Sequence, residues 1–169
     1  MIQKKVCMVG VYGTGKTSLV QRFVHSMFSQ RYLSTVGVKI DRKPLELDGT
    51  AVTLMLWDLA GRDGQEDITT SYLRGAHAIL YVADGTRKET CDQLGELRAL
   101  GREAAGEVPE LLALNKSDLV DQWALKPGDE QALASAWEMV RTSAKTGAGV
   151  EEAFQRLGRA TLAAKEARS

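Results

Sequence analysis

A glycine-rich segment near the amino terminus constrains the fold of this chain more than any other feature. Residues 10–17 read Gly-Val-Tyr-Gly-Thr-Gly-Lys-Thr and fit the pattern G-x-x-x-x-G-K-[ST]. The apolar run at 6–11 predicts a buried strand before this segment, and the periodicity of 16–25 predicts a helix after it. A strand that leads through a glycine-rich loop into a helix is the context in which this pattern holds phosphate. We therefore expect an α/β fold with a phosphate-binding loop.

The residue types in the loop indicate how phosphate would be held. Glycines let the backbone curl, so that successive N–H groups point at phosphate oxygens near the positive end of the following helix. Lys16 would bring a positive charge to the outer phosphates, and the Thr17 hydroxyl would bind Mg²⁺. The residues expected to contact the nucleotide here are Gly13, Thr14, Gly15, Lys16, Thr17 and Ser18. A glycine-rich turn in an unrelated α/β protein is the alternative, and the motif alone does not identify the nucleotide.

The rest of the chain alternates short apolar runs with helix-period segments, which predicts βαβ units around a largely parallel sheet. Asp48-Gly49 separates the expected strands 38–47 and 50–57, and such a two-residue connection is typical of an antiparallel hairpin. Pro44 lacks a backbone N–H, which places the first of these strands at the sheet edge. Further strands are expected at 78–83, 111–114 and 138–141, and helices at 88–104, at 127–136 and from Val150 onward.

We therefore expect one domain over residues 1–169, with a three-layer α/β fold of the P-loop NTPase type. Its six-stranded sheet is mostly parallel, with one antiparallel edge strand, and about five helices flank it. Lys+Arg and Asp+Glu both number 22, so no net charge favours nucleic acid or an anionic membrane as partner. The separated Cys7 and Cys91 indicate a reducing, cytoplasmic setting. We expect the protein to be a monomer. We also expect no membrane span and no lipid anchor on a prenylated cysteine.

A second polar motif, Asn115-Lys116-Ser117-Asp118, follows an expected strand, where open α/β sheets bind ligands. The Asp118 carboxylate would accept hydrogen bonds from N1–H and the exocyclic amine of guanine, a pattern that adenine does not offer. Asn115 would brace the loop, and the Lys116 stem would cover the ring. Ser143, Ala144 and Lys145 would complete the wall with a backbone N–H to the guanine carbonyl. Alone, N-K-x-D also fits a polar turn; its combination with the phosphate loop indicates a guanine nucleotide.

In this order and spacing, the motifs resemble the Ras superfamily of small GTPases nearly end to end. Residues 31–38 and 71–77 resemble the Rab branch, and the segment 32–40 together with the opening Met-Ile-Gln-Lys-Lys resembles bacterial Rab-like proteins. The resemblance implies a switch that binds GTP or GDP with Mg²⁺. It also implies that Phe28 stacks against the guanine, although a core aromatic at a helix end is an equally good interpretation of that residue alone.

The resemblance further implies two segments that respond to the γ-phosphate. Thr35 would bind Mg²⁺ and contact the γ-phosphate, Asp58 would orient a Mg²⁺-bound water, and the Gly61 N–H would reach the γ-phosphate. Loss of that phosphate would let both segments relax, and protein partners would distinguish the two states. The partners implied are effectors, an exchange factor and an activating protein, with longin- or roadblock-type proteins as candidates among bacterial relatives.

Four residues are expected to influence hydrolysis: Lys16, Gly61, Tyr12 and Arg62. The last two depart from the family pattern. Arg62 replaces the usual glutamine, and a guanidinium cannot accept the hydrogen bond that positions water. Tyr12 replaces a small residue and would crowd the γ-phosphate. We expect slow hydrolysis; the alternatives are a scaffold that holds nucleotide without turnover, or Arg62 acting as a built-in arginine finger. A nucleoside kinase would need a second substrate site and lid arginines, and the sequence offers no such segment.

Overall fold

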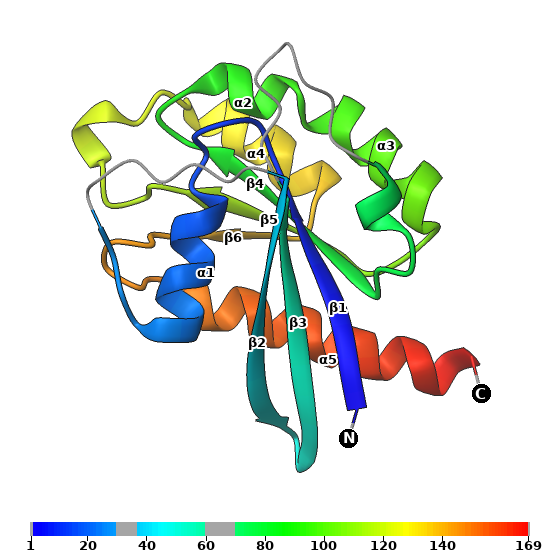
Figure 1. The fold of residues 1–169 in the computed structure, drawn as a ribbon. Coiled ribbons are helices and arrows are strands. Elements are labelled where there is room, and N and C mark those ends of the chain that lie inside the picture. Colours follow the sequence, from blue (N-terminus) through cyan, green and yellow to red (C-terminus); the bar gives the residue numbers. More distant parts are fainter. Residues whose placement is uncertain (1, 30–36, 60–69, 169) are drawn as a thin grey trace.

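A computed structural model describes residues 2–29, 37–59 and 70–168 of the protein (Figure 1). They form a six-stranded sheet in the order β2-β3-β1-β4-β5-β6, in which only the β2–β3 pair is antiparallel. The strands are β1 Ile2–Val9, β2 Val38–Leu47, β3 Thr50–Leu59, β4 Ala78–Asp84, β5 Glu110–Asn115 and β6 Met139–Arg141. The helices are α1 Lys16–His25, α2 Lys88–Asp92, α3 Leu94–Ala105, α4 Pro127–Ala136 and α5 Val150–Arg168, with 3₁₀ turns η1 Thr70–Leu73 and η2 Val120–Gln122. The predicted fold class is confirmed.

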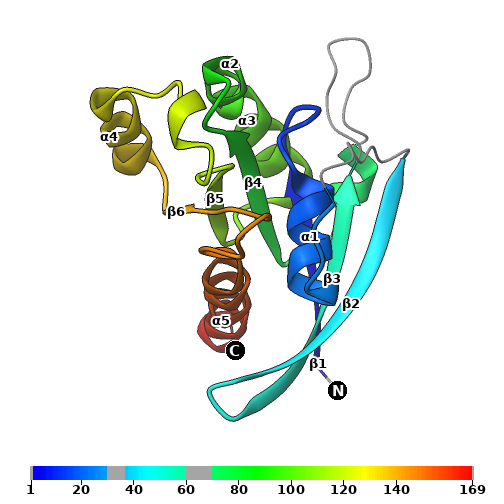
Figure 2. The ribbon, with the colours of Figure 1, turned by 90° about the vertical axis from the view of Figure 1, so that its left-hand side faces the viewer.

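Helices cover both faces of the sheet (Figure 2). Alternate residues of β1 point to opposite faces, so Met8 packs with Phe23 of α1 and Phe154 of α5, whereas Cys7 packs with Leu97 of α3 on the other side. The Phe23 and Phe154 rings stack with centroids 4.2 Å apart. Because both faces are buried, the central strands read as continuous apolar runs rather than as alternating patterns.

The β2–β3 hairpin forms as its turn residues predict. Asp48 and Gly49 have φ values of 51° and 84°, and the strands pair from Leu47 opposite Thr50 to Val38 opposite Leu59. Pro44 lies on β2, which is the edge strand of the sheet. The backbone of residues 48–49 therefore sets the register of the one antiparallel pair.

Two elements differ from the sequence-based expectation by more than two residues or in number, and the bounds of the others agree within two residues. Strand β1 is Ile2–Val9, not 6–11. It begins earlier because residues 2–5 pair with residues 52–55 of β3, where the Lys5 Nζ packs 3.7 Å from the centroid of the Trp57 ring, and it ends earlier because the phosphate loop starts at residue 10. The helix expected at 88–104 is two helices, interrupted at Gln93 with φ −89° and ψ −7°. Leu94 and Leu97 both lie within α3 and keep their helical spacing. The periodicity of apolar residues therefore does not reveal the interruption at Gln93.

The sheet topology brings separate loops together at the carboxyl ends of the central strands. Strands β1, β4 and β5 are parallel neighbours, so their carboxyl ends, and the loops that begin at Gly10, Asp84 and Asn115, lie side by side. Among the described helices, none is both long and apolar enough to span a bilayer.

Candidate nucleotide-binding site

The loop between β1 and α1 needs glycine for two separate reasons. Gly13 and Gly15 have φ values of 80° and 100°, a left-handed region that side chains with a Cβ disfavour. Close approach adds a second constraint, because a Cβ on Gly15 would lie 2.3 Å from Nδ2 of Asn115. A Cβ on Gly10 would lie 2.4 Å from the carbonyl oxygen of Val82. The glycine pattern thus reflects backbone curvature and tight packing of this loop on the strands beside it.

Lys16 is buried inside the loop. Its Nζ donates hydrogen bonds of 3.1 and 3.2 Å to the carbonyl oxygens of Gly10 and Val11. Burial lowers the pKa of Lys16 to about 8; the Asp58 carboxylate opposes this shift and Arg87 adds to it. Because this ammonium group lies among carbonyl oxygens and away from water, its electrostatic attraction to a bound anion would be strong.

Thr17 and Asp58 bring a hydroxyl and a carboxylate together at the start of α1 and the end of β3. The Thr17 hydroxyl donates a hydrogen bond of 2.6 Å to Oδ2 of the fully buried Asp58. Hydroxyl and carboxylate oxygens suit Mg²⁺, which usually takes one or two protein ligands and completes its shell with phosphate and water. Among the described residues, no three or more His, Cys, Asp or Glu side chains are grouped so that they could hold a metal ion.

A cavity of about 290 Å³ lies beside the phosphate loop. It is close to the smallest of the ~300–1,000 Å³ pockets that usually hold small ligands. The cavity joins three segments that are far apart in the sequence, and it is lined by Gly15, Ser18, Phe28, Asn115, Lys116, Asp118, Leu119, Ala144 and Lys145. The N-K-x-D motif, the 143–145 loop and Phe28 therefore share one pocket with the phosphate loop.

Hydrogen bonds fix the polar walls of this cavity. The Ser143 hydroxyl donates to Oδ1 of Asp118 at 2.7 Å and accepts from the backbone N–H of Thr146. Asn115 donates from Nδ2 to the carbonyl oxygen of Thr14 at 2.9 Å and accepts at Oδ1 from the Thr142 hydroxyl. Asn115 is thus tied both to the phosphate loop and to Thr142, and Asp118 is tied to the neighbouring Ser143.

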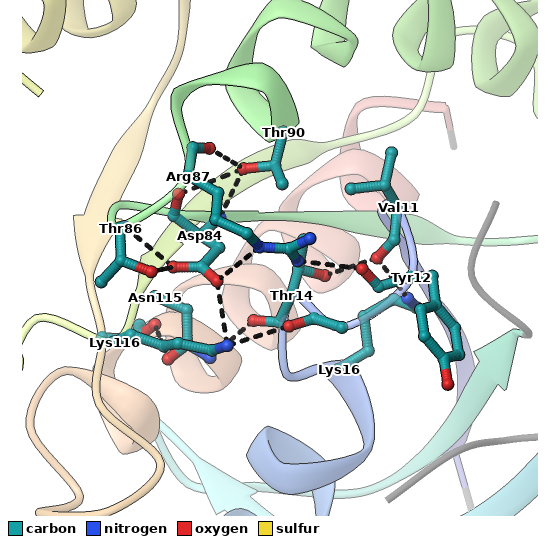
Figure 3. A network of polar contacts seen from close by, with 12 residues as sticks. Val11, Tyr12, Thr14, Lys16, Asp84, Thr86, Arg87, Thr90, Asn115 and Lys116 are labelled. Carbon is teal, nitrogen blue, oxygen red and sulfur yellow. Dashed lines mark hydrogen bonds and ion pairs between the residues drawn. The ribbon is translucent and has the colours of Figure 1, made fainter. Parts of the chain in front are cut away.

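Lys116 extends from the N-K-x-D segment to the phosphate loop. Its backbone has φ 66°, unusual for a residue with a side chain, and its Nζ donates to the carbonyl oxygen of Gly13 at 3.0 Å. The same Nζ lies 2.9 Å from Oδ2 of Asp84 (Figure 3). Asp84 is buried, which raises its pKa, but hydrogen bonds from Thr86 and Lys116 outweigh burial and hold that pKa below the ordinary value.

Several residues of the site are not evident from the sequence. Asp84 could have been suspected, because it is a polar residue at the end of the buried strand β4, as Asn115 is at the end of β5. Arg22 donates from Nε to the carbonyl oxygen of Ala144 at 2.7 Å and also bonds the carbonyl of Lys145. On sequence alone Arg22 is an ordinary polar residue of an amphipathic helix, and Leu119 an ordinary apolar one.

Some predicted residues cannot be placed. Thr35, Gly61 and Arg62 lie outside the described residues, so their expected roles at Mg²⁺, at the γ-phosphate and in hydrolysis stay predictions. Tyr12 is described: it lies on the outer turn of the phosphate loop, is 46% exposed, and its ring projects away from the polar network (Figure 3).

Comparison with known proteins identifies the family of this chain. The sequence model of the Ras family matches residues 5–163. Ras-related protein Rab-1 of Theileria annulata is 38% identical over 160 residues, which cover 92% of this chain and 73% of the relative. GTP-binding protein ypt1 of Schizosaccharomyces pombe is 35% identical over 176 residues, covering 98% and 87%. Human Ras-related protein Rab-8B is 35% identical over 158 residues, covering 92% and 76%. The chain belongs to the Ras family of small GTPases and is Rab-like.

Proposed function

We propose that this protein is a guanine-specific, Mg²⁺-dependent switch that hydrolyses GTP slowly and binds a protein partner in its GTP state. The observation that carries the proposal is the cavity shared by Asp118, Lys116 and the phosphate-loop residue Gly15. Its two ends suit the two ends of a guanine nucleotide. Membership of the Ras family supports the same assignment, because the family consists of GTP/GDP switches.

Selection of the base would depend on Asp118. The Ser143 hydroxyl already binds one carboxylate oxygen, which fixes the side chain toward the cavity. Guanine offers two N–H donors on the edge that would face this carboxylate, whereas adenine presents an unprotonated ring nitrogen there. An acceptor left unpaired inside the site costs about 1–3 kcal/mol, so adenine nucleotides should bind much more weakly.

The polyphosphate and Mg²⁺ would be held by α1 and the loop before it. Lys16 would exchange its carbonyl partners for phosphate oxygens, which compensate its charge more fully. The Thr17 hydroxyl donates its hydrogen to Asp58, so its oxygen lone pairs stay available to a metal ion. Mg²⁺, when bound, would neutralise charge on the outer phosphates. Asp58 then acts mainly by orienting the Thr17 hydroxyl and a metal-bound water.

Slow hydrolysis would follow from Tyr12 and Arg62. Tyr12 brings a large side chain to the outer turn of the phosphate loop, where the family has a small one, and it would restrict access to the γ-phosphate. Arg62 offers donors only, and the attacking water needs an acceptor to orient it. Both features also suit a scaffold that retains GTP, and the rate of phosphate release distinguishes the two functions.

Partner binding is proposed for the β2 edge of the sheet. Ile40 is 45% exposed on this strand, directly opposite Trp57 of β3. The outer edge of β2 pairs with no described strand, so a partner could extend the sheet there as well as contact the apolar side chains. Residues 61–74 would complete the surface in the GTP state. The partner would be an effector protein, with an exchange factor and an activating protein acting on the same switch.

The test is to identify the nucleotide that copurifies with the protein by mass and then to follow a single turnover of bound GTP. We expect guanine nucleotide at a ratio near one per protein chain. Phosphate release should occur at or below the ~10⁻⁴ s⁻¹ typical of an unassisted small GTPase. Release faster than about one per minute would contradict slow hydrolysis. GTP that persists unchanged for many hours would indicate the scaffold, and the absence of guanine nucleotide would contradict the proposal as a whole.

A further inference from the structure

The carbonyl groups of the phosphate loop share a regular pattern of partners. A loop that turns its N–H groups inward to an anion must turn carbonyl groups elsewhere, and buried carbonyl groups need donors. Five consecutive carbonyl oxygens, those of residues 10–14, each accept a hydrogen bond from a side chain. The donors are Lys16 for residues 10 and 11, Thr14 also for residue 11, Arg87 for residue 12, Lys116 for residue 13 and Asn115 for residue 14.

The outer turn depends on two cations that share one anion. Arg87 donates from Nη2 to the carbonyl oxygen of Tyr12 at 2.9 Å, and Lys116 donates to that of Gly13 at 3.0 Å. Oδ2 of Asp84 lies 3.1 Å from Nε of Arg87 and 2.9 Å from Nζ of Lys116 (Figure 3). One carboxylate therefore holds two cations, which hold two successive carbonyl groups.

The Asp84 carboxylate is itself firmly placed. Its side chain is 1% exposed, and its Oδ1 accepts hydrogen bonds from both the backbone N–H and the hydroxyl of Thr86. Thr90, at the other end of the turn, receives a hydrogen bond from the Asp84 backbone N–H. This anchor at the carboxyl end of β4 is more rigid than the long side chains that it positions.

We propose that Arg87, held by Asp84, is a positioning residue for the phosphate loop: it fixes the outer turn at Tyr12 so that the loop is preorganised for the polyphosphate. The inference rests on the proposed nucleotide-binding function and adds a residue that the family motifs do not include. Arg87 is 39% exposed, so its ion pair with Asp84 alone would contribute little, and its role depends on the bridge between carboxylate and carbonyl.

The bridge requires arginine rather than any cation. The guanidinium presents Nε and Nη2 as separate donors in a rigid plane, and here they bind different acceptors. A lysine at this position would have one ammonium centre on a flexible stem. It would keep the positive charge near the phosphates but would not span Asp84 and the Tyr12 carbonyl with fixed geometry.

The experiment compares GDP release from the intact protein with release from Arg87→Ala, Arg87→Lys and Lys88→Ala. The last is a matched control, because Lys88 is the next residue, carries the same charge and forms a long ion pair, at 3.8 Å, with Asp129. We expect Arg87→Ala to release GDP about three- to tenfold faster, from loss of one charge-assisted hydrogen bond at a partly exposed site. Arg87→Lys should stay within about twofold of Arg87→Ala, and Lys88→Ala within about twofold of the unmodified protein.

A second readout separates positioning of this loop from general loosening of the site. Inosine diphosphate lacks the exocyclic amine that Asp118 would bind, so the ratio of GDP to inosine diphosphate affinity reports the base end alone. Arg87→Ala should weaken both nucleotides by the same factor and leave the ratio unchanged. A reduced ratio would overturn the proposal, as would release from Arg87→Lys or Arg87→Ala at the rate of the unmodified protein. If the unmodified protein bound no guanine nucleotide, the proposed function would fail instead, so the two failures are distinguishable.

Discussion

The Thr17 hydroxyl donates a hydrogen bond of 2.6 Å to Oδ2 of Asp58, which joins the first turn of α1 to the carboxyl end of β3. Strand β3 pairs with β1 so that Asp58 lies opposite Met8, just before the phosphate loop begins. The parallel register of two strands therefore brings together a hydroxyl and a carboxylate that are 41 residues apart in the sequence. Sheet geometry, rather than a local motif, assembles this part of the site.

Replacement of Asp58 should weaken Mg²⁺ binding. Asp58→Ala removes the acceptor that orients the Thr17 hydroxyl, and loss of such an orienting partner typically costs about 10–100-fold in metal affinity. The measurement is GDP release as a function of free Mg²⁺, whose midpoint should move to higher concentration by that factor. Thr17→Ser keeps a hydroxyl and serves as control. An unchanged midpoint in Asp58→Ala would show that this pair does not serve the metal.

Gly15 and Gly95 should respond oppositely to replacement by alanine. In Gly15→Ala, the positive φ and the 2.3 Å approach to Asn115 both impose strain, which should lower the free energy of unfolding by about 1–3 kcal/mol. In Gly95→Ala, an exposed position in the first turn of α3 with open space around it, the same change should raise that free energy by about 0.5 kcal/mol. Urea titrations of both variants provide the comparison. Equal stability of the two variants would mean that the conformation at Gly15 does not require glycine.

Lys16 should make nucleotide affinity depend on pH. Its pKa of about 8 in the folded protein lies below the ordinary 10.5, so the unfolded chain holds the proton more tightly. The stability of the nucleotide-free protein should therefore rise with pH between these values. The phosphates of GDP favour the charged form of Lys16. The affinity for GDP should therefore fall as the pH rises, by about fourfold between pH 7 and 8.5. Calorimetry across this pH range measures the affinity and the protons taken up. Above pH 8 we expect GDP binding to be accompanied by net proton uptake. A flat profile would contradict the buried position of Lys16.

Arg62→Gln should accelerate GTP hydrolysis. Glutamine supplies the acceptor for water that arginine lacks, so single-turnover phosphate release should become faster, by about tenfold or more. Tyr12→Gly should act in the same direction by removing the ring at the outer turn. A slower reaction in Arg62→Gln would instead mean that Arg62 already stabilises the γ-phosphate as a built-in cation.

Local signals explain what the sequence predicts well. The hairpin depends on Asp48 and Gly49, whose backbone preference is independent of distant contacts, and the phosphate loop depends on closely spaced glycines. The largely parallel sheet follows from alternation of apolar runs with helical segments, and the edge position of β2 follows from Pro44. These features are encoded within short stretches of the chain, so residue types and their spacing are enough to predict them.

Long-range contacts explain what the sequence does not predict. Arg87 and Tyr12 are 75 residues apart, and Arg22 and Ala144 are 122 apart, so no short stretch of the chain contains both partners. The first residues of β1 are not evident from the sequence for the same reason. A lysine is expected to be exposed unless its neighbour is known, and Lys5 packs against the distant Trp57.

The identification of the site depends on base recognition by Asp118, which an exchange of the nucleotide base can test. The measurement is the affinity of the unmodified protein and of Asp118→Asn for GDP and for xanthosine diphosphate. Asp121→Asn, which changes an exposed acidic residue outside the cavity, is the control. We expect Asp118→Asn to lose GDP affinity and to gain affinity for xanthosine diphosphate, in which an oxygen replaces the exocyclic amine of guanine and needs a hydrogen-bond donor. If Asp118→Asn retained the original preference for GDP, Asp118 would not recognise the base.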